Sequence, residues 1–252
     1  MPTALPQPLR NTRVLSLALN LPGPAALMRC ARMGAECTKL EPPPAPGYPS
    51  ADPMGIYSPA AYATLHDGVR VVHAHLKTPE GQAALHDELA RTDVLITSFR
   101  PSALTKLGLG WDALQAQYPR LSLVRIVGAA AERAEEPGHD LTYLADAGLV
   151  TGTEMPPTLY ADMGGALMAS EAVLQALLER AHTGSGVCIE VALADAAAWL
   201  AQPRHWGLTT PDGDVGGHHA GYRIYPCADG RVAVAALEPH FAASLCAAAG
   251  LP

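Results

Sequence analysis

Residues 12–40 read TRVLSLALNLPGPAALMRCARMGAECTKL, and this stretch decides the fold class. The apolar run at 12–17 predicts a strand, and after a Pro-Gly-Pro turn residues 25–33 predict a helix that ends at Gly34. A second apolar run at 36–40 predicts another strand. A strand, a helix and a strand in this order are typical of an α/β protein.

The same alternation continues along the chain. Thr78 and Pro79 form a helix start, because Thr is a preferred N-cap residue and Pro suits the first helical position. Residues 42–62 are rich in Pro and lack periodicity, so we predict a loop there. The remaining strands are predicted at 70–76, 94–98, 121–127 and 188–192, and the remaining helices at 102–107, 111–118, 140–149, 163–181 and from 192 to about 201.

Composition divides the chain into three parts. Residues 1–202 predict a large Rossmann-like α/β domain with a parallel sheet and flanking helices. Residues 203–221 are rich in Gly and His and predict a linker. Residues 222–252 contain two strand patterns joined by a turn at Asp229 and Gly230, followed by a helix, and predict a partial, smaller α+β domain.

The bulk composition excludes several classes of protein. The formal net charge of -7 argues against a nucleic-acid binder, which needs a concentrated basic face. The five cysteines share no CxxC spacing, so we expect neither disulfides nor a metal site. The N-terminus lacks a signal-peptide pattern and no stretch reaches the ~20 apolar residues of a membrane span. We therefore expect a cytoplasmic protein that has no membrane partner.

Standard nucleotide and hydrolase motifs are absent, since the sequence contains no GxGxxG, no GK[ST] loop and no GxSxG elbow. Three acid or histidine positions remain beside predicted helix starts. His139 is either a turn residue or a general base, because imidazole can take and return a proton near neutral pH. Asp162 and Glu238 are either helix caps or first-turn carboxylates, or catalytic acids. Two glycines after Asp162 weaken a helix start, which favours close approach of a ligand to the backbone there.

Many short segments together resemble the family III CoA-transferases of the CaiB/BaiF superfamily, from about residue 9 to the C-terminus. None of them is specific alone. They are RVLSL (13–17), PGP (22–24), MGAE (33–36), KLEPP (39–43), LKTPEG (76–81), DVL (93–95), FRP (99–101), LGLG (107–110), YPRL (118–121), and ER followed by TGSG (179–186).

This resemblance implies a function and a set of site residues. Asp162 matches the acid that is the nucleophile in the transferases and a proton-transfer acid in the α-methylacyl-CoA racemases. His139 and the pair Glu238-Pro239 are similar to the racemases, whereas the transferases usually carry an aromatic residue in place of His139. The racemase reading is therefore favoured. It predicts that His139 and Asp162 flank a planar enolate, and that Glu238 orients or buffers one of them.

The resemblance also implies how the substrate binds. Coenzyme A enters as part of an acyl-CoA substrate rather than as a tightly bound cofactor, and it lies across the large domain. Arg100, Lys39 and Arg70 are expected near its phosphates. The backbone N–H groups of Met163, Gly164 and Gly165 are expected to stabilise the enolate oxygen. Family members form interlocked homodimers, so a homodimer is expected.

Three departures from the family pattern keep other functions open. Asp67 stands where the family carries a basic stretch, and Gly128-Ala-Ala-Ala replaces a Gly-aromatic-Gly-Gln turn. The chain also ends soon after Glu238, so we expect a truncated small domain. A CoA-transferase that uses Asp162 as nucleophile is the first alternative. A CoA-binding protein without catalytic activity is the second.

Overall fold

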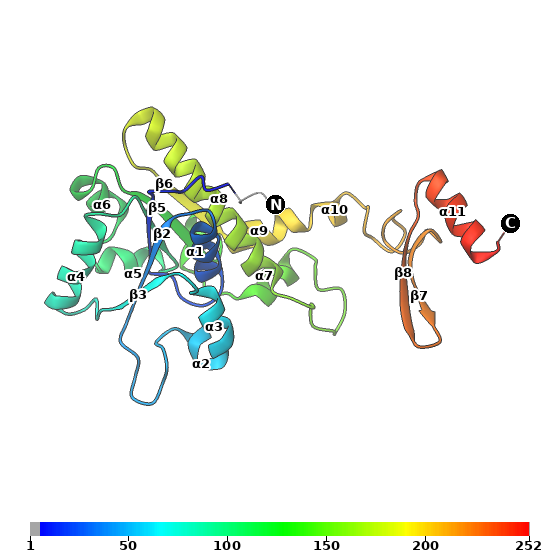
Figure 1. Cartoon of the computed structure of the whole chain (residues 1–252), viewed down its shortest axis with the longest axis horizontal. Coiled ribbons are helices and arrows are strands. Elements are labelled where there is room, and N and C mark those ends of the chain that lie inside the picture. The colour runs from blue at the N-terminus through cyan, green and yellow to red at the C-terminus, as the bar shows by residue number, and fades with distance from the viewer. Residues whose placement is uncertain (1–5, 252) are drawn as a thin grey trace. The chain divides into compact units, whose positions relative to one another are not determined.

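The computed structural model describes residues 6–251, which divide into two compact units at Ala198 and Trp199. The first unit holds a six-stranded sheet with helices on both faces (Figure 1). Its strands are β1 (Arg13–Ser16), β2 (Glu36–Glu41), β3 (Arg70–His73), β4 (Val94–Thr97), β5 (Ser122–Val127) and β6 (Cys188–Ala192).

All neighbouring strands in this sheet run parallel, in the order β3-β2-β1-β4-β5-β6. The predicted parallel α/β fold is therefore confirmed. The strand order reverses between β1 and β4, and in open α/β sheets such a reversal opens a crevice at the carboxyl ends of the strands. The fold thus places a binding site after β1 and β4.

The helices of the first unit follow the strands in turn. They are α1 (Pro22–Arg32), α2 (Pro53–Tyr57), α3 (Pro59–Leu65), α4 (Pro79–Leu89), α5 (Pro101–Lys106), α6 (Trp111–Gln117), the short 3₁₀ helix η1 (Ala131–Glu135), α7 (Asp140–Asp146), α8 (Tyr160–Thr183) and α9 (Leu193–Leu200), which runs across the boundary between the units.

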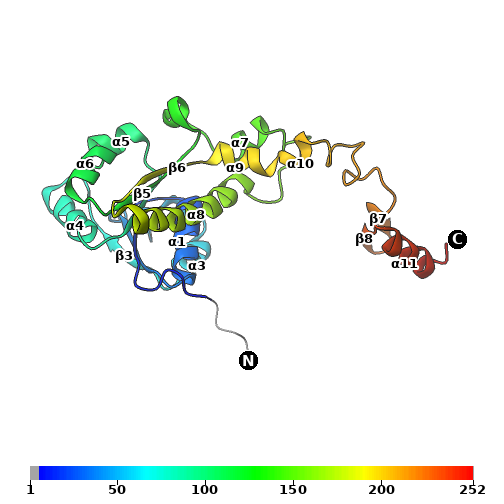
Figure 2. The same cartoon turned by 90° about the horizontal axis from the view of Figure 1, so that it is seen from above.

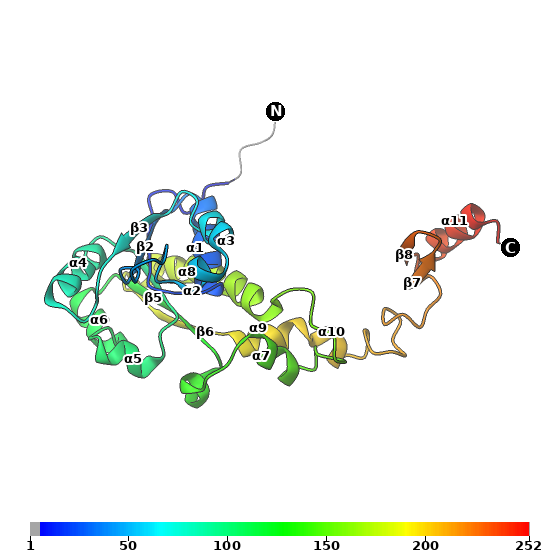
Figure 3. The same ribbon diagram turned by 90° about the horizontal axis from the view of Figure 1, so that it is seen from below.

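Two hydrophobic clusters cover the two faces of the sheet, because successive strand residues point to opposite faces. Val14 of β1 packs with α1 and α8 on one face, whereas Leu15 packs with α4 and α6 on the other. Val94 and Leu95 of β4 divide in the same way. Figures 2 and 3 show α1 beside α8, and α4, α5 and α6 grouped away from them.

Two expectations about helices need correction. The stretch 42–62 is not wholly a loop, because α2 forms within it and α3 begins within it, and both begin with Pro at the first helical position. The side chain of Asp52 caps α2 by accepting the Met54 N–H. The long helix α8 was expected to be buried all round. Instead its small residues pack inward, and Leu167 and Leu178 are 50% and 62% exposed.

The second unit consists of three further elements after the short helix α10 (Gln202–His205). Strands β7 (Tyr222–Cys227) and β8 (Gly230–Ala235) pair antiparallel, and helix α11 (Pro239–Ala249) follows. Cys227 pairs with Gly230, so Ala228 and Asp229 form the two-residue turn. The hairpin turn therefore lies one residue before its predicted position.

Candidate functional site

A cavity of about 660 Å³ opens at the carboxyl ends of β1, β4 and β5, where the reversal of strand order predicts a site. Asn20 after β1 and Arg100 after β4 line it. His139 and Asp162 line it from the start of α7 and of α8. The fold thus brings together three residues that the sequence singled out from three separate segments.

His139 is the N-cap residue of α7, in extended backbone conformation. Its backbone N–H donates to the Thr142 hydroxyl oxygen at 3.0 Å, and this bond fixes the start of the helix. The imidazole is exposed and lines the cavity. His139 is thus a helix-start residue whose ring remains available to a ligand.

Asp162 lies in the first turn of α8 and is tied to α7 through its backbone. The carboxylate of Asp140, which is 5% exposed, accepts the Asp162 N–H at 3.0 Å. Burial raises the pKa of the Asp162 carboxyl from 3.8 to about 6, the nearby Asp140 adds to the rise, and His139 opposes it. Asp162 can therefore exchange a proton near neutral pH.

The Met163 N–H, expected to stabilise an enolate oxygen, already has an acceptor within helix α8. Helix α8 begins at Tyr160, three residues before the predicted start, so the Met163 N–H already donates to the Leu159 carbonyl oxygen at 3.0 Å. Gly164 and Gly165 follow it inside the helix, where N–H groups point toward the preceding turn. Gly165 serves packing instead, because a Cβ there would overlap the Leu193 side chain.

Arg100 is exposed at the cavity and carries a free charge. Within residues 6–251, no ion pair or side-chain hydrogen bond includes its guanidinium. The carboxylate of Glu135 lies within its electrostatic reach but is held by Ser102, whose N–H and hydroxyl donate to it at 2.7 and 2.9 Å. Arg100 can therefore receive an anionic group.

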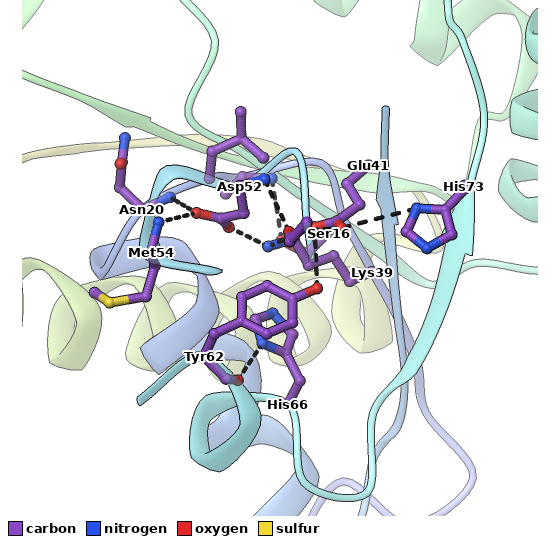
Figure 4. A network of polar contacts seen from close by, with 12 residues as sticks. Ser16, Asn20, Lys39, Glu41, Asp52, Met54, Tyr62, His66 and His73 are labelled. Atoms are coloured by element: carbon purple, nitrogen blue, oxygen red, sulfur yellow. Dashed lines mark hydrogen bonds and ion pairs between the residues drawn. The ribbon is translucent and has the colours of Figure 1, made fainter. Parts of the chain in front are cut away.

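Lys39 lies in a buried polar network and not at the cavity surface. Its side chain is fully buried, and the ammonium contacts the carboxylate of Asp52 and that of Glu41, the latter at 3.2 Å. Figure 4 shows Asp52 placed between Lys39 and the backbone N–H groups of Asn20 and Met54. A phosphate could reach the ammonium only if this network opened.

The rest of the network surrounds Glu41. The hydroxyls of Ser50 and Tyr62 donate to its two carboxylate oxygens at 2.9 and 3.1 Å, and His73 lies 3.8 Å away. Because Asp52 also accepts the N–H of Asn20, a residue with a positive φ of 64°, the network fixes the loop that follows β1. Lys39 thus supports the cavity wall from behind.

Arg70 lies in a different hollow, at the amino ends of β1, β2 and β3. Its guanidinium donates to Glu88 at 2.6 Å and to the Thr38 hydroxyl at 3.0 Å. The structure therefore does not bring Arg70 together with Arg100.

Glu238 belongs to the second unit. It is the exposed N-cap residue of α11, and its backbone carbonyl accepts the N–H groups of Phe241 and Ala242. Its side chain makes no capping bond. The role beside His139 or Asp162 that the resemblance implies stays a prediction.

The sequence analysis assigned neither Asn20 nor Tyr143 to the site, although both line the cavity. Asn20 gave no signal, because its place depends on its bond to Asp52. Tyr143 did give one, since it lies four residues after His139 in a predicted helix and so shares its face. Across residues 6–251, no group of three His, Cys, Asp or Glu could hold a metal ion. Over the same range, no helix is long and apolar enough to cross a membrane.

Comparisons with known proteins agree on one family. The sequence profile of CoA-transferase family III matches residues 9–252. Human α-methylacyl-CoA racemase is 30% identical over 251 residues, which cover 92% of this chain and 62% of the racemase. The succinyl-CoA–D-citramalate CoA-transferase of Chloroflexus aurantiacus is 30% identical, with 89% and 60% covered. The chain thus spans about three fifths of the length of these two relatives.

Solved structures give the same result. A hypothetical protein of Mycobacterium tuberculosis superimposes with a TM-score of 0.82 and 27% identity, and the match covers 98% of this chain and 69% of that protein. A CaiB/BaiF family protein of Brucella suis gives a TM-score of 0.81 at 27% identity, with 98% and 70% covered.

Proposed function

Because the chain belongs to CoA-transferase family III, we propose that it inverts the α-carbon of 2-methylacyl-CoA thioesters as a racemase. Members of this family include both a racemase and CoA-transferases. The observation that carries the choice is the pairing of His139 with Asp162 in one cavity, on two different helices. Two proton-transfer groups are what inversion of an acidic carbon requires, one for each face.

The proposed mechanism proceeds through an enolate. One of the two groups removes the α-proton, and the other delivers a proton to the opposite face of the planar intermediate. Asp162, with a pKa of about 6, is mainly ionised at neutral pH and can act as base. Its protonated form can act as acid for the other enantiomer. Each such group contributes about 10²- to 10⁴-fold to the rate.

The cavity also has a place for the anionic part of the substrate. Arg100 lines it and is not neutralised by an ion pair within the described residues. We propose that Arg100 contacts a phosphate of coenzyme A, which enters as part of the substrate. A guanidinium suits phosphate because its N–H groups form a planar fork. Lys39 and Arg70 are not part of this proposal, since each already forms ion pairs with carboxylates of this chain.

The decisive experiment follows α-proton exchange. The protein is incubated with (S)- and (R)-2-methylacyl-CoA in D₂O, and NMR measures deuterium at the α-carbon. Exchange from both enantiomers is expected, with a loss of about 10²-fold or more in His139→Ala and in Asp162→Asn. His182→Ala, at the exposed end of α8, is the matched control and keeps the wild-type rate. A folded wild-type protein that exchanges neither enantiomer contradicts the proposal.

A CoA-transferase is the second candidate, because several transferases are among the relatives. In that reaction the Asp162 carboxylate attacks the thioester carbonyl, the C–S bond breaks, CoA leaves as the thiolate, and an acyl-aspartyl anhydride remains on the protein. His139 separates the two functions. Transfer survives His139→Ala but not Asp162→Asn, whereas racemisation is lost in both variants. Measuring CoA transfer between two carboxylic acids in these variants therefore decides between the candidates.

A further inference from the structure

Tyr143 lies one helical turn after His139 in α7 and lines the same cavity as Asp162 and Arg100. Its side chain is largely buried, with 8% of the residue exposed. The proposed reaction has so far given this tyrosine no role. Its place beside both proton-transfer groups makes the position of its hydroxyl the next question.

Two glycines from separate segments lie against the Tyr143 hydroxyl. Gly128 follows β5, and Gly138 immediately precedes His139. A Cβ atom at either position would overlap the Tyr143 hydroxyl oxygen. Both glycines therefore leave room for this hydroxyl, and they hold it where the end of β5 meets the start of α7.

The hydroxyl has no partner in the described part of the protein. None of the hydrogen bonds among residues 6–251 includes it. It is also not fully enclosed, since the only enclosed side-chain N or O atom without a partner in this range is Nε2 of His66. A largely buried donor that lacks a protein acceptor and faces a cavity is available to a ligand.

The electrostatic surroundings keep this donor protonated. Burial raises the pKa of the Tyr143 hydroxyl, the Asp162 carboxylate adds to the rise, and Arg100 opposes it. These influences also show that the ring lies within electrostatic reach of both cavity residues. A neutral hydroxyl can donate a hydrogen bond to a developing oxyanion, whereas a phenolate could not.

We infer that Tyr143 is a further catalytic residue, whose hydroxyl donates a hydrogen bond to the thioester oxygen of the bound acyl-CoA. The inference rests on the proposed racemase function. When His139 or Asp162 takes the α-proton, the electron pair of the C–H bond forms the C=C bond of the enolate. The carbonyl π pair then moves to the oxygen. Tyr143 keeps its proton throughout and stabilises this oxygen, a part that the occupied Met163 N–H cannot take.

The first test is the isosteric variant Tyr143→Phe. We expect its exchange rate in D₂O to fall about 100-fold, the usual effect of removing one oxyanion donor. KM is expected to rise by a smaller factor than kcat falls, because the hydrogen bond already forms to the bound thioester oxygen and strengthens as the enolate forms. Tyr118→Phe removes a hydroxyl that bonds to His86 outside the cavity, so it is the matched control. An unchanged kcat in a folded Tyr143→Phe protein overturns the inference.

A second measurement keeps this inference separate from the proposed function. Calorimetric titration compares isobutyryl-CoA with isobutyl-CoA, a thioether that lacks the carbonyl oxygen. We expect wild-type protein to prefer the thioester and Tyr143→Phe to lose most of that preference. If the wild-type protein exchanges neither enantiomer, the racemase proposal fails and this comparison still decides the role of Tyr143. Equal affinity of wild-type protein for the two ligands, or a preference that Tyr143→Phe keeps, overturns the inference.

Discussion

Asp162 lines the cavity, and burial of its carboxylate there lowers the stability of the folded protein. Its carboxyl pKa is about 6 in the folded protein, compared with 3.8 for an ordinary Asp, so ionisation is less favourable after folding than before. The penalty is absent below about pH 4, grows as pH rises through this window, and is complete above pH 6. At about 1.4 kcal/mol for each pKa unit, it approaches 3 kcal/mol.

Asp162→Asn is therefore expected to stabilise the protein while abolishing exchange. At pH 8 the free energy of unfolding rises by about 2–3 kcal/mol, because the amide has no charge to bury. At pH 4 the gain falls below about 1 kcal/mol, since wild-type Asp162 is then protonated in the folded state. Urea unfolding at both pH values measures the difference. A gain that does not depend on pH contradicts this explanation.

Asp140 provides a second pH prediction. Its carboxylate raises the pKa of Asp162, so Asp140→Asn lowers that pKa while Oδ1 still accepts the Asp162 N–H. The acid limb of the exchange rate, where Asp162 gains its proton, is expected to move to lower pH. The pH profile of kcat measures the shift. Asp146→Asn, exposed in the same helix, serves as control, and a limb that stays in place refutes the coupling.

The residue types of the site could be predicted from the sequence, but their partners could not. Arg100, His139 and Asp162 share a cavity because β4, α7 and α8 each end or begin at one edge of the sheet. That Asp140 would raise the Asp162 pKa depends on a contact across 22 positions. Lys39 was expected at a phosphate, because nothing in the sequence shows that Asp52 folds back onto it.

At the scale of elements, N-cap residues explain which helix starts were predicted from the sequence and which were missed. Thr78 and Pro79 were predicted to begin a helix, and α4 begins there with the Thr78 hydroxyl accepting the Gly81 N–H at 3.1 Å. The same kind of start at Asp52 and Pro53 was missed. Five residues of α2 give too short a pattern to distinguish from a Pro-rich loop.

The α4 cap can be tested directly. Thr78→Ala removes the hydroxyl that satisfies the Gly81 N–H and is expected to lower the free energy of unfolding by about 1 kcal/mol. Thr78→Ser keeps the acceptor and restores most of the loss. Chemical unfolding of the three proteins gives the comparison. Equal stability of Thr78→Ala and wild-type protein rules out a contribution of the cap.

At the scale of the whole molecule, the main core belongs to the first unit. Among the described residues, the hydrophobic clusters on both faces of the sheet take their buried members from the first unit. In the second unit, large apolar side chains such as Ile224 and Phe241 are 63% and 50% exposed. The first unit therefore has what it needs to fold alone.

A chain that ends at Ala201, just after α9, is expected to fold cooperatively. Its melting temperature, followed by circular dichroism, lies within a few degrees of the full-length value, because the sheet and both clusters are intact. A chain that ends at Ala176 is the contrasting case, since it lacks β6 and the end of α8, and it does not fold. If the Ala201 chain is unfolded at 25 °C, the second unit contributes to the core.

The buried set of Lys39, Glu41 and Asp52 has a consequence for how this sequence can change over time. Loss of the lysine alone leaves two carboxylates without their cation, at a cost of about 3–5 kcal/mol. Joint replacement of all three by apolar residues of similar volume can be nearly neutral. A series of single substitutions from the charged set to the apolar set therefore passes through a poorly folded intermediate. The three positions are therefore expected to be inherited as a block, and to co-vary among descendants of this gene when they vary at all.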